Sequence, residues 1–411
     1  MSRGKDLQPH IGIFGRRNYG KSSLINFIIN QDVAIVSTVA GTTTDPVKKT
    51  IEIQGIGPVV IIDTAGIDDV GELGQKRVEK TYEVLKIIDL AILVINNNLF
   101  ADPEKRIIAK FQEYSIPFII VHNKSDIDKI FDSLKNSLQV AYYTRAIDVS
   151  TFNKNTLEPL VNLIKQSIPE NAYRSRSIVG DLIGYGDVVL LITPIDIEAP
   201  EGRLILPQVQ VIRDVLDNDG IAIVIKEREA DIYMRIMNPL PKLVVTDSQV
   251  FLKADAIVPP NIPLTSFSIL LARQKGDFEH YIKGTPYISK LKDGDRLLIL
   301  ESCTHHVSCD DIGRIKIPRW ISNFTGKNIE YEVVSGLNKL PRDINEYAMV
   351  IQCGGCVLTR KQILNRLKPA IDAGIPVSNY GLAISFVQGI FYRAISPFLI
   401  DKNTVNKNEY L

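Results

Sequence analysis

Two cysteines separated by two glycines end an apolar run at residues 351–356, where the sequence is I-Q-C-G-G-C. A C-x-x-C turn lets both sulfurs reach one metal, and glycines at the middle positions leave room for it and allow positive φ. A third cysteine, Cys303, follows another apolar run at 297–300. Residues just past the carboxyl ends of neighbouring parallel strands face one crevice. We therefore expect Cys303, Cys353 and Cys356 to bind one ion or cluster.

A fourth ligand is needed, and several residues near Cys303 carry suitable atoms. They are Glu301, His305, His306, Cys309, Asp310 and Asp311, of which His305, Cys309 and Asp310 are the main candidates. Three sulfurs with one weak or exchangeable ligand favour a [4Fe-4S] cluster, whereas a closed set of four thiolates, or of three thiolates and one imidazole, favours structural zinc. Spacing alone leaves both open. With four cysteines in 411 residues, a disulfide framework is not expected.

A second group of chemical residues lies near the N-terminus, where residues 15–22 read G-R-R-N-Y-G-K-S between an apolar strand and an apolar helix. Backbone amides of such a loop hold phosphate oxygens at a helix N-terminus. Lys21 is expected to reach the β and γ phosphates, and Ser22 to bind Mg²⁺. The residues of this loop that we expect to contact nucleotide are Gly15, Asn18, Tyr19, Gly20, Lys21, Ser22 and Ser23.

Further motifs turn this phosphate loop into a GTPase. The strand at 60–63 ends in Asp63-x-x-Gly66, in which Asp63 can hold Mg²⁺ and the Gly66 amide can sense the γ-phosphate. The strand ending at 123–126 carries N-K-x-D, so Asn123, Lys124 and Asp126 are predicted to bind guanine, because only guanine offers the N1 and N2 donor pair to a carboxylate. Thr43 is the expected switch threonine and Mg²⁺ ligand. Ser150 is the expected backbone contact to guanine.

In order and spacing, these motifs resemble the TrmE-Era-EngA branch of P-loop GTPases. The resemblance implies that Lys21, Thr43, Asp63 and Gly66 serve GTP hydrolysis. Ile67 stands where Ras-like enzymes carry a water-orienting glutamine, so slow intrinsic hydrolysis is expected. Asn18 stands where potassium-stimulated members carry an asparagine that helps to hold K⁺. We therefore expect stimulation by K⁺.

The composition is that of a globular protein without a strong net electrostatic field. Lys plus Arg number 48 and Asp plus Glu 47, so the charge balance favours neither nucleic acid nor an anionic membrane as a partner. The first ten residues have no apolar signal core, and no apolar run is long enough to span a bilayer. The expected compartment is the cytoplasm.

The elements that position these residues predict an α/β fold with several domains. We expect a P-loop GTPase domain (1–169), a linker (170–177), a small α/β block without a chemical motif (178–260), a C-terminal α/β domain (261–400) and a tail (401–411). In the small block we expect strands at 187–193, 220–226 and 242–246 and helices at 204–216 and 230–237. An edge strand there would join the sheets of two copies, which predicts a homodimer. In the C-terminal domain we expect strands at 296–301, 329–334 and 348–352 and helices at 263–274, 280–290, 319–324, 360–373 and 382–392.

This organisation resembles the HydF family of GTPases, which serve maturation of [FeFe]-hydrogenase. The family pattern is C-x-H followed much later by H-C-x-x-C. Cys303-Thr304-His305 and Cys353 to Cys356 match it, and Gln352 replaces the second histidine. The resemblance implies GTP/GDP, Mg²⁺ and a [4Fe-4S] cluster as cofactors. It also implies a carrier that receives a diiron precursor from the radical-SAM maturases HydE and HydG and delivers it to apo-hydrogenase, with switch loops at 40–45 and 67–73.

A ribosome- or tRNA-associated GTPase with a structural zinc module is the alternative. The near-neutral charge and the lack of a Lys/Arg stripe argue against it.

Overall fold

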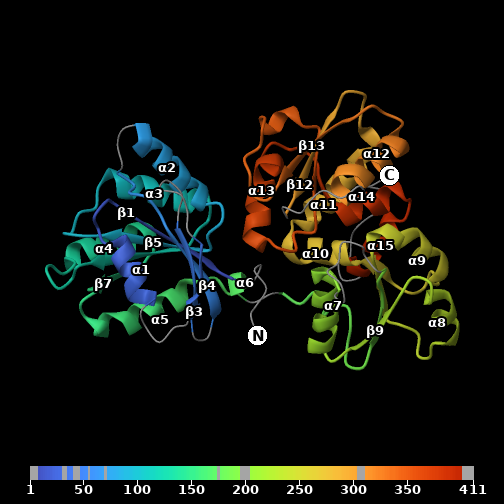
Figure 1. Cartoon of the computed structure of the whole chain (residues 1–411), viewed down its shortest axis with the longest axis horizontal. Helices are drawn as coiled ribbons and strands as arrows, with labels where there is room; N and C mark the ends of the chain where they lie inside the picture. The colour runs from blue at the N-terminus through green and yellow to red at the C-terminus, as the bar shows by residue number, and fades with distance from the viewer. Residues whose placement is uncertain are drawn as a thin grey trace. The chain divides into compact units, whose positions relative to one another are not determined.

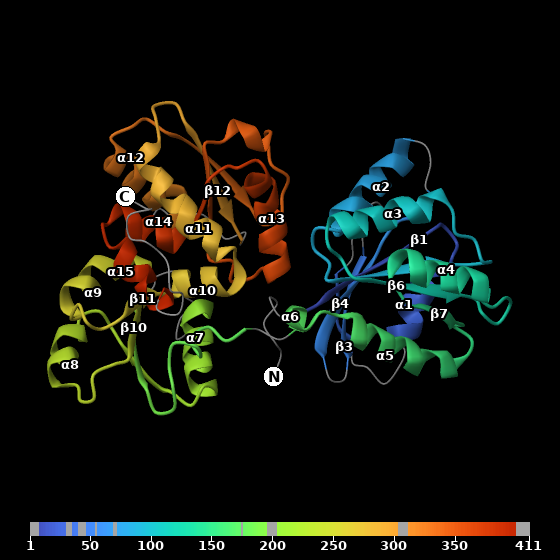
Figure 2. The same ribbon diagram turned by 180° about the vertical axis from the view of Figure 1, so that it is seen from behind.

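The structure is a computed structural model of the 411-residue chain, and it describes residues 8–29, 35–39, 47–53, 56–68, 72–173, 176–194, 204–302 and 311–399. The chain forms two compact units, residues 1–175 and 176–411 (Figures 1 and 2). In the part of the chain that is described, no helix combines the length and apolar character required to cross a bilayer.

The N-terminal unit is built on one sheet with the strand order β2-β3-β4-β1-β5-β6-β7. Its strands are β1 (His10–Gly15), β2 (Ile35–Val39), β3 (Val47–Ile53), β4 (Gly57–Asp63), β5 (Leu90–Ile95), β6 (Phe118–Asn123) and β7 (Ala146–Val149). Its helices are α1 (Lys21–Ile29), α2 (Glu72–Val84), α3 (Asp102–Glu113), α4 (Asp132–Tyr142), α5 (Leu157–Ser167) and α6 (Glu170–Tyr173). Strand β3 is antiparallel to both of its neighbours, and the pairings from β4 to β7 are parallel.

Continuous apolar strands form the centre of this sheet because helices cover both of its faces. All six residues of β5, L-A-I-L-V-I, are buried. One core contains residues of α1 and α5, and the other contains residues of α2, α3 and α4 (Figure 1). The strand and helix expected on either side of the G-x-x-x-x-G-K-S loop are confirmed as β1 and α1.

The C-terminal unit contains a middle sheet of parallel strands in the order β11-β10-β8-β9. Its strands are β8 (Val188–Ile192), β9 (Ile221–Ile225), β10 (Leu243–Thr246) and β11 (Leu264–Ser266), and its helices are α7 (Leu206–Asp217), α8 (Ala230–Ile236), α9 (Phe251–Ile257) and α10 (Phe267–Lys275). The β-α-β-α-β order expected for residues 187–246 is confirmed. The domain boundary expected at residue 260 falls before β11, which pairs with β10.

The same unit contains a C-terminal sheet, also parallel, in the order β13-β12-β14-β15. Its strands are β12 (Arg296–Glu301), β13 (Glu330–Ser335), β14 (Met349–Gln352) and β15 (Val377–Asn379). Its helices are α11 (Phe278–Gly284), η4 (Thr285–Lys290, 3-10), η5 (Ile312–Lys316, π), α12 (Ile317–Thr325), α13 (Arg360–Asp372), α14 (Tyr380–Val387) and α15 (Phe391–Ile395). One face packs on α12 and α14, and the other packs on α13.

Three helices expected in this region were wrong in detail. The segment 263–274 begins with strand β11, and helix α10 starts only after Ser266, whose side chain accepts a hydrogen bond from the Ile269 amide. The segment 280–290 is α-helical only to Gly284 and continues as the 3-10 helix η4. The segment 382–392 is divided between α14 and α15 by Gly389, whose φ of 78° ends an α-helix.

Candidate functional site

The phosphate loop connects β1 to α1, and its lysine is hydrogen-bonded to the loop's own backbone. Lys21 Nζ donates to the carbonyl oxygens of Gly15 at 3.0 Å and Arg16 at 2.9 Å. The loop reverses through positive φ at Asn18 (62°) and Gly20 (83°). A side chain at position 20 would also place its Cβ 2.4 Å from Asn123 Nδ2, so both backbone and space require glycine there.

A buried ion pair anchors the start of this loop. Arg16 Nε and Nη2 each lie 2.7 Å from a carboxylate oxygen of Glu104 on α3, whose side chain is fully buried. The same carboxylate accepts the Ala101 amide at 2.9 Å. The bonds to Glu104 raise the pKa of Arg16 above its already high ordinary value. Sequence reasoning missed Glu104, because nothing in its neighbourhood marks it as a partner of residue 16.

Two of the three residues expected to bind Mg²⁺, Ser22 and Asp63, meet at the carboxyl end of β4. Ser22 Oγ donates to Asp63 Oδ2 at 2.6 Å. Asp63 Oδ1 is buried and has no hydrogen-bond partner among the described residues. A hydroxyl beside a carboxylate oxygen that lacks a partner is a donor set that fits Mg²⁺. The Ile67 amide donates to Gly15 O at 3.2 Å, which brings the D-x-x-G segment against the phosphate loop. The expected Thr43 lies outside the described residues.

The expected guanine-binding residues are tied to the phosphate loop and to one another. Asn123 Nδ2 donates to Tyr19 O at 2.9 Å, and Lys124 Nζ donates to Asn18 O at 3.4 Å. Ser150 Oγ donates to Asp126 Oδ1 at 2.6 Å. The structure therefore brings the separate motifs of the N-terminal unit to one edge of its sheet.

The C-G-G-C turn follows β14, directly beside the end of β12. The two strands are parallel neighbours, with Leu300 in register with Gln352. Cys353 Sγ accepts the Ser302 amide at 3.0 Å and lies 2.8 Å from Ser302 Oγ. Since Ser302 immediately precedes Cys303, the expected approach of the two cysteine-bearing strand ends is confirmed as far as Ser302.

The turn itself requires glycine at its second middle position. Gly355 has a φ of 67°, and a Cβ there would lie 2.2 Å from Ile363 Cδ1. Burial raises the pKa of the Cys353 thiol, while hydrogen bonds from the Ser302 side chain and the Gly355 backbone lower it. Amide donors around a sulfur are what a bound thiolate needs. The two described thiols, Cys353 and Cys356, therefore fit a cluster or a zinc ion.

Other expected ligands lie elsewhere or are engaged. Cys303, His305, His306, Cys309 and Asp310 lie outside the described residues. Glu301 accepts from Arg314 Nη2 at 2.8 Å and from Ser335 Oγ at 2.8 Å, and Asp311 caps η5. Among the residues that the structure describes, no group of three or more His, Cys, Asp or Glu side chains is placed to hold a metal ion.

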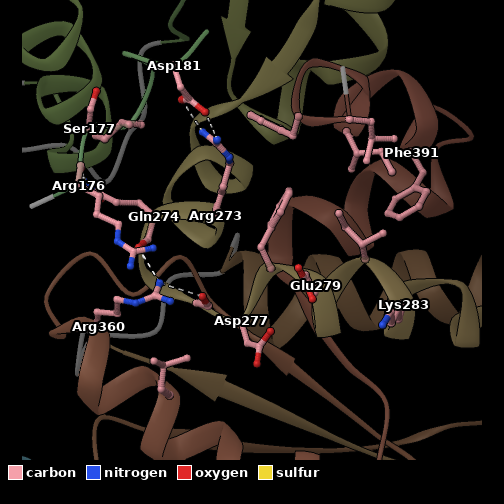
Figure 3. A pocket seen from close by; sticks show the side chains of 18 of the residues that line it. Arg176, Ser177, Asp181, Arg273, Gln274, Asp277, Glu279, Lys283, Arg360 and Phe391 are labelled. Carbon is pink, nitrogen blue, oxygen red and sulfur yellow. Dashed lines mark hydrogen bonds and ion pairs between the residues drawn. The ribbon is translucent and has the colours of Figure 1, made fainter. Parts of the chain in front are cut away.

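A cavity of about 1030 Å³ in the C-terminal unit was not indicated by any motif (Figure 3). Its charged lining includes Arg273, whose Nη1 donates to Asp181 Oδ1 at 2.9 Å and whose guanidinium lies 5.0 Å from the Phe398 ring centroid. Arg360 Nη1, at the start of α13, donates to Gln274 O at 2.9 Å and Gly276 O at 3.1 Å. Arg360 thereby ties the helix that follows the C-G-G-C turn to the end of α10.

Family models match successive parts of the chain. Residues 10–124 match the model described as 50S ribosome-binding GTPase. Residues 178–276 match the hydrogen maturase F dimerization domain, and residues 279–397 match the hydrogen maturase F tetramerization domain.

Two curated relatives each align with less than half of this chain. The tRNA modification GTPase MnmE of Aliarcobacter butzleri is 35% identical over 166 residues, which is 40% of this chain and 35% of that protein. GTPase Der of Wolinella succinogenes is 40% identical over 121 residues, 28% of this chain and 26% of that protein. The chain thus spans about a third or less of the length of these relatives. The crystal structure of a variant of Aquifex aeolicus Era bound to GDP and aluminium fluoride aligns with 58% of this chain and 100% of its own, at 20% identity and a TM-score of 0.34.

Proposed function

The chain belongs to the hydrogen maturase F family, and we propose that it is a GTP-hydrolysing carrier that holds a [4Fe-4S] cluster for [FeFe]-hydrogenase maturation. In this proposal it receives a diiron precursor from HydE and HydG and transfers it to apo-hydrogenase. The nucleotide and cluster sites are chemically separate, and GTP acts by changing the switch loops at 40–45 and 67–73 and so the contacts with partners.

The observation that carries the proposal is the contact between Ser302 and Cys353. It supports placing Cys303 beside Cys353 and Cys356, at the carboxyl ends of two adjacent parallel strands. These three sulfurs would hold the cluster, and the fourth ligand would be His305, Cys309 or Asp310. Where that fourth ligand is weak or exchangeable, the cluster would supply an iron that another molecule can reach.

When nucleotide binds, Lys21 would exchange its hydrogen bonds to the Gly15 and Arg16 carbonyls for bonds to phosphate oxygens. Its ammonium is already within 3.0 Å of the loop backbone, so it needs only a local movement to reach the β and γ phosphates. Ser22, Asp63 and Thr43 would hold Mg²⁺, and Asn123, Lys124, Asp126 and Ser150 would select guanine. Gly66 would sense the γ-phosphate.

Asn18 would hold K⁺ near the phosphates, as an added positive charge where no water-orienting glutamine follows Gly66. GTP hydrolysis should then be several-fold faster in KCl than in NaCl at equal ionic strength. Asn18→Ala should remove the difference without abolishing nucleotide binding. Equal rates in the two salts for the unmodified protein would exclude the K⁺ site.

The edge strand β9 supports self-association. It is the outer strand of the middle sheet, within the segment that matches a dimerization domain. Its residues Ile221 and Val224 are 49% and 41% exposed, which is unusual for two apolar residues on an unpaired edge. Light scattering at micromolar concentration should give a mass of two or more chains, and Val224→Lys should lower it.

Anaerobic reconstitution with iron and sulfide, followed by metal analysis and EPR of the reduced protein, tests the cluster directly. About four irons per chain with a reduced [4Fe-4S] signal is the expected result. One tightly bound zinc without such a signal would instead indicate a GTPase with a structural zinc module.

A further inference from the structure

A buried lysine far from the cysteines in sequence holds the C-G-G-C loop. Lys275, the last residue of α10, is only 6% exposed. Its Nζ donates to the carbonyl oxygens of Gly355 at 3.2 Å, Cys356 at 3.3 Å and Leu358 at 3.4 Å. These three bonds go to the backbone of the loop that carries both described thiols. The loop is therefore wrapped around a positive charge.

A second cation holds the other cysteine-bearing strand end. Arg366 on α13 donates through Nη1 to Glu301 O and through Nη2 to Val334 O, each at 2.6 Å. Glu301 is the last residue of β12, two positions before Cys303. Burial lowers the pKa of Arg366, and the nearby Cys353 thiol acts in the opposite direction. The backbone leading to Cys303 is thus fixed to β13 by a second partly buried positive charge.

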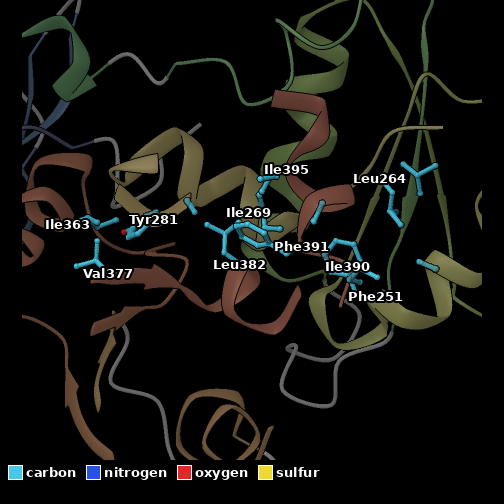
Figure 4. Close-up of a cluster of buried hydrophobic side chains, with 14 of the residues drawn as sticks. Phe251, Leu264, Ile269, Tyr281, Ile363, Val377, Leu382, Ile390, Phe391 and Ile395 are labelled. Atoms are coloured by element: carbon cyan, nitrogen blue, oxygen red, sulfur yellow. The ribbon is translucent and has the colours of Figure 1, made fainter. Parts of the chain in front are cut away.

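The helices that carry these cations share one apolar core, so the cations have fixed positions. Ile269 and Ala272 of α10 and Ile363 and Leu367 of α13 belong to a single cluster of buried side chains. Figure 4 shows Ile363, Tyr281 and Ile269 of this cluster in that order from left to right. A charge carried on packed helices keeps its distance from a ligand better than one on a surface loop.

The hydrogen bonds described above link both cations to backbone carbonyl groups, which are dipoles that stabilise a positive charge. A charge in a poorly solvated position is stabilised further when an opposite charge lies beside it. The acidic side chain at the end of β12, Glu301, pairs with Arg314 at 2.8 Å and also interacts electrostatically with Arg366. Thiolates and a cluster that carries net negative charge would interact favourably with both cations.

We propose that Lys275 and Arg366 are positioning residues for the cluster, which fix the two cysteine-bearing strand ends and place positive charge beside an anionic occupant. This inference rests on the proposed function. It assigns a role to two residues outside the cysteine motif, and it makes the reduced cluster easier to form, because reduction adds negative charge next to two cations.

Potentiometric titration followed by EPR tests the charge. Lys275→Met and Arg366→Met should each lower the midpoint potential of the reconstituted cluster, whereas Lys275→Arg and Arg366→Lys should stay close to the unmodified protein. Lys368→Met is the matched control, because Lys368 lies on the same helix as Arg366 but is 52% exposed and screened by water. A fall of equal size in Lys368→Met, or no fall in either neutral variant, would overturn the role of these charges.

Hydrogen exchange in the protein without cluster tests the positioning and does not depend on iron. Lys275→Met should accelerate exchange of the amides at 353–358, while the sheet amides of β12 and β14 keep their protection. Unchanged exchange in the loop would remove the positioning role. If the unmodified protein takes up no cluster although its loop exchange responds to Lys275→Met, the proposed function fails and the loop anchor stands.

Discussion

The phosphate loop and the C-G-G-C loop each bind a lysine ammonium, but the two lysines have different roles. Each follows a parallel strand, and in each a lysine ammonium is bound by main-chain carbonyls of the loop. Lys21 belongs to its own loop and can exchange these carbonyls for phosphate. Lys275 lies 80 residues from Gly355 in sequence and is buried beneath the loop. One lysine is thus a ligand-binding group, and the other is part of the scaffold.

This difference decides how much a single substitution should damage each site. The phosphate loop should lose its ability to promote GTP hydrolysis when Lys21 is removed. Its backbone conformation should remain, because the glycines and the Arg16–Glu104 pair maintain it. A loop organised by distant cations keeps its thiols when those cations are removed but loses their placement. Substitutions at the two sites should therefore have separable effects.

Removing Lys21 should have the largest effect on the first site. Lys21→Ala removes the cation that meets the β and γ phosphates, so GTP turnover should fall at least about 100-fold. Iron content after reconstitution should be unchanged. Steady-state phosphate release and metal analysis on the same preparation measure both. Loss of iron from a folded Lys21→Ala protein would contradict the independence of the two sites.

Removing Cys353 should give the reverse pattern. Cys353→Ser replaces a thiolate ligand by a hydroxyl that binds iron poorly, so the EPR signal of the reduced cluster should be lost. GTP turnover should remain within about twofold, because the phosphate loop obtains no residue from the C-terminal unit in this proposal. If Cys353→Ser abolished GTP hydrolysis while circular dichroism stayed native, the comparison between two separate sites would fail.

Breaking the buried pair beneath the phosphate loop should cost stability. Glu104→Gln leaves the Arg16 guanidinium facing an amide instead of a carboxylate at 2.7 Å. A broken buried ion pair costs ~3 kcal/mol, so we expect a loss of about that size in the urea unfolding free energy of the N-terminal unit, with weaker GTP binding.

The matched control for this substitution lies on the same helix. Glu113 of α3 pairs with Lys110 at 2.6 Å, but its side chain is 53% exposed. Glu113→Gln should change stability by less than about 0.5 kcal/mol. Equal losses for Glu104→Gln and Glu113→Gln would mean that burial of the Arg16 pair does not support the loop.

The sequence predicted the features that short segments determine, and it did not predict the side-chain contacts between distant segments. The phosphate loop could be identified because G-x-x-x-x-G-K-S, D-x-x-G and N-K-x-D are each short segments with their own charges. The strands β12 and β14 could be placed from their apolar runs, and so the approach of Ser302 to Cys353 could be expected. Glu104, Lys275 and Arg366 could not, because their respective partners Arg16, Gly355 and Glu301 lie 65 to 88 residues away.

Two of the errors in secondary structure have different causes. Residues 264–266, L-T-S, run directly into the following helix without a glycine or proline between them, and pairing with β10 makes them a strand. Gly389 interrupts an apolar stretch that has helical periodicity on both sides, and its positive φ is visible only in the folded chain. At 264–266 a pairing between distant segments outweighs local preference, whereas at Gly389 the glycine itself ends the helix through local hydrogen bonds.

Protonation of Cys353 in the protein without cluster depends on the balance between burial and hydrogen bonding. Burial raises its thiol pKa, while Ser302 Oγ, 2.8 Å from the sulfur, counteracts this. Alkylation of Cys353 by iodoacetamide should therefore be slow at neutral pH and should still be increasing above the ordinary thiol range. In Ser302→Ala, the rise of the alkylation rate with pH should occur at higher pH than in the unmodified protein. Peptide mass spectrometry across pH 6 to roughly 10.5 resolves the site.

The raised pKa of Cys353 also determines how the folding stability of the C-terminal unit changes with pH. A thiol with a raised pKa binds its proton more tightly in the folded chain than in the unfolded chain. Its contribution to folding is complete below the unfolded pKa and is lost as pH rises through the folded one. The C-terminal unit without cluster should consequently lose stability at alkaline pH, and Cys353→Ser should lose less over the same range. A low-pKa Cys353, alkylated fully at pH 7, would mean that the cations at 275 and 366 outweigh burial, and the C-G-G-C loop would then resemble the phosphate loop in being charged before its ligand arrives.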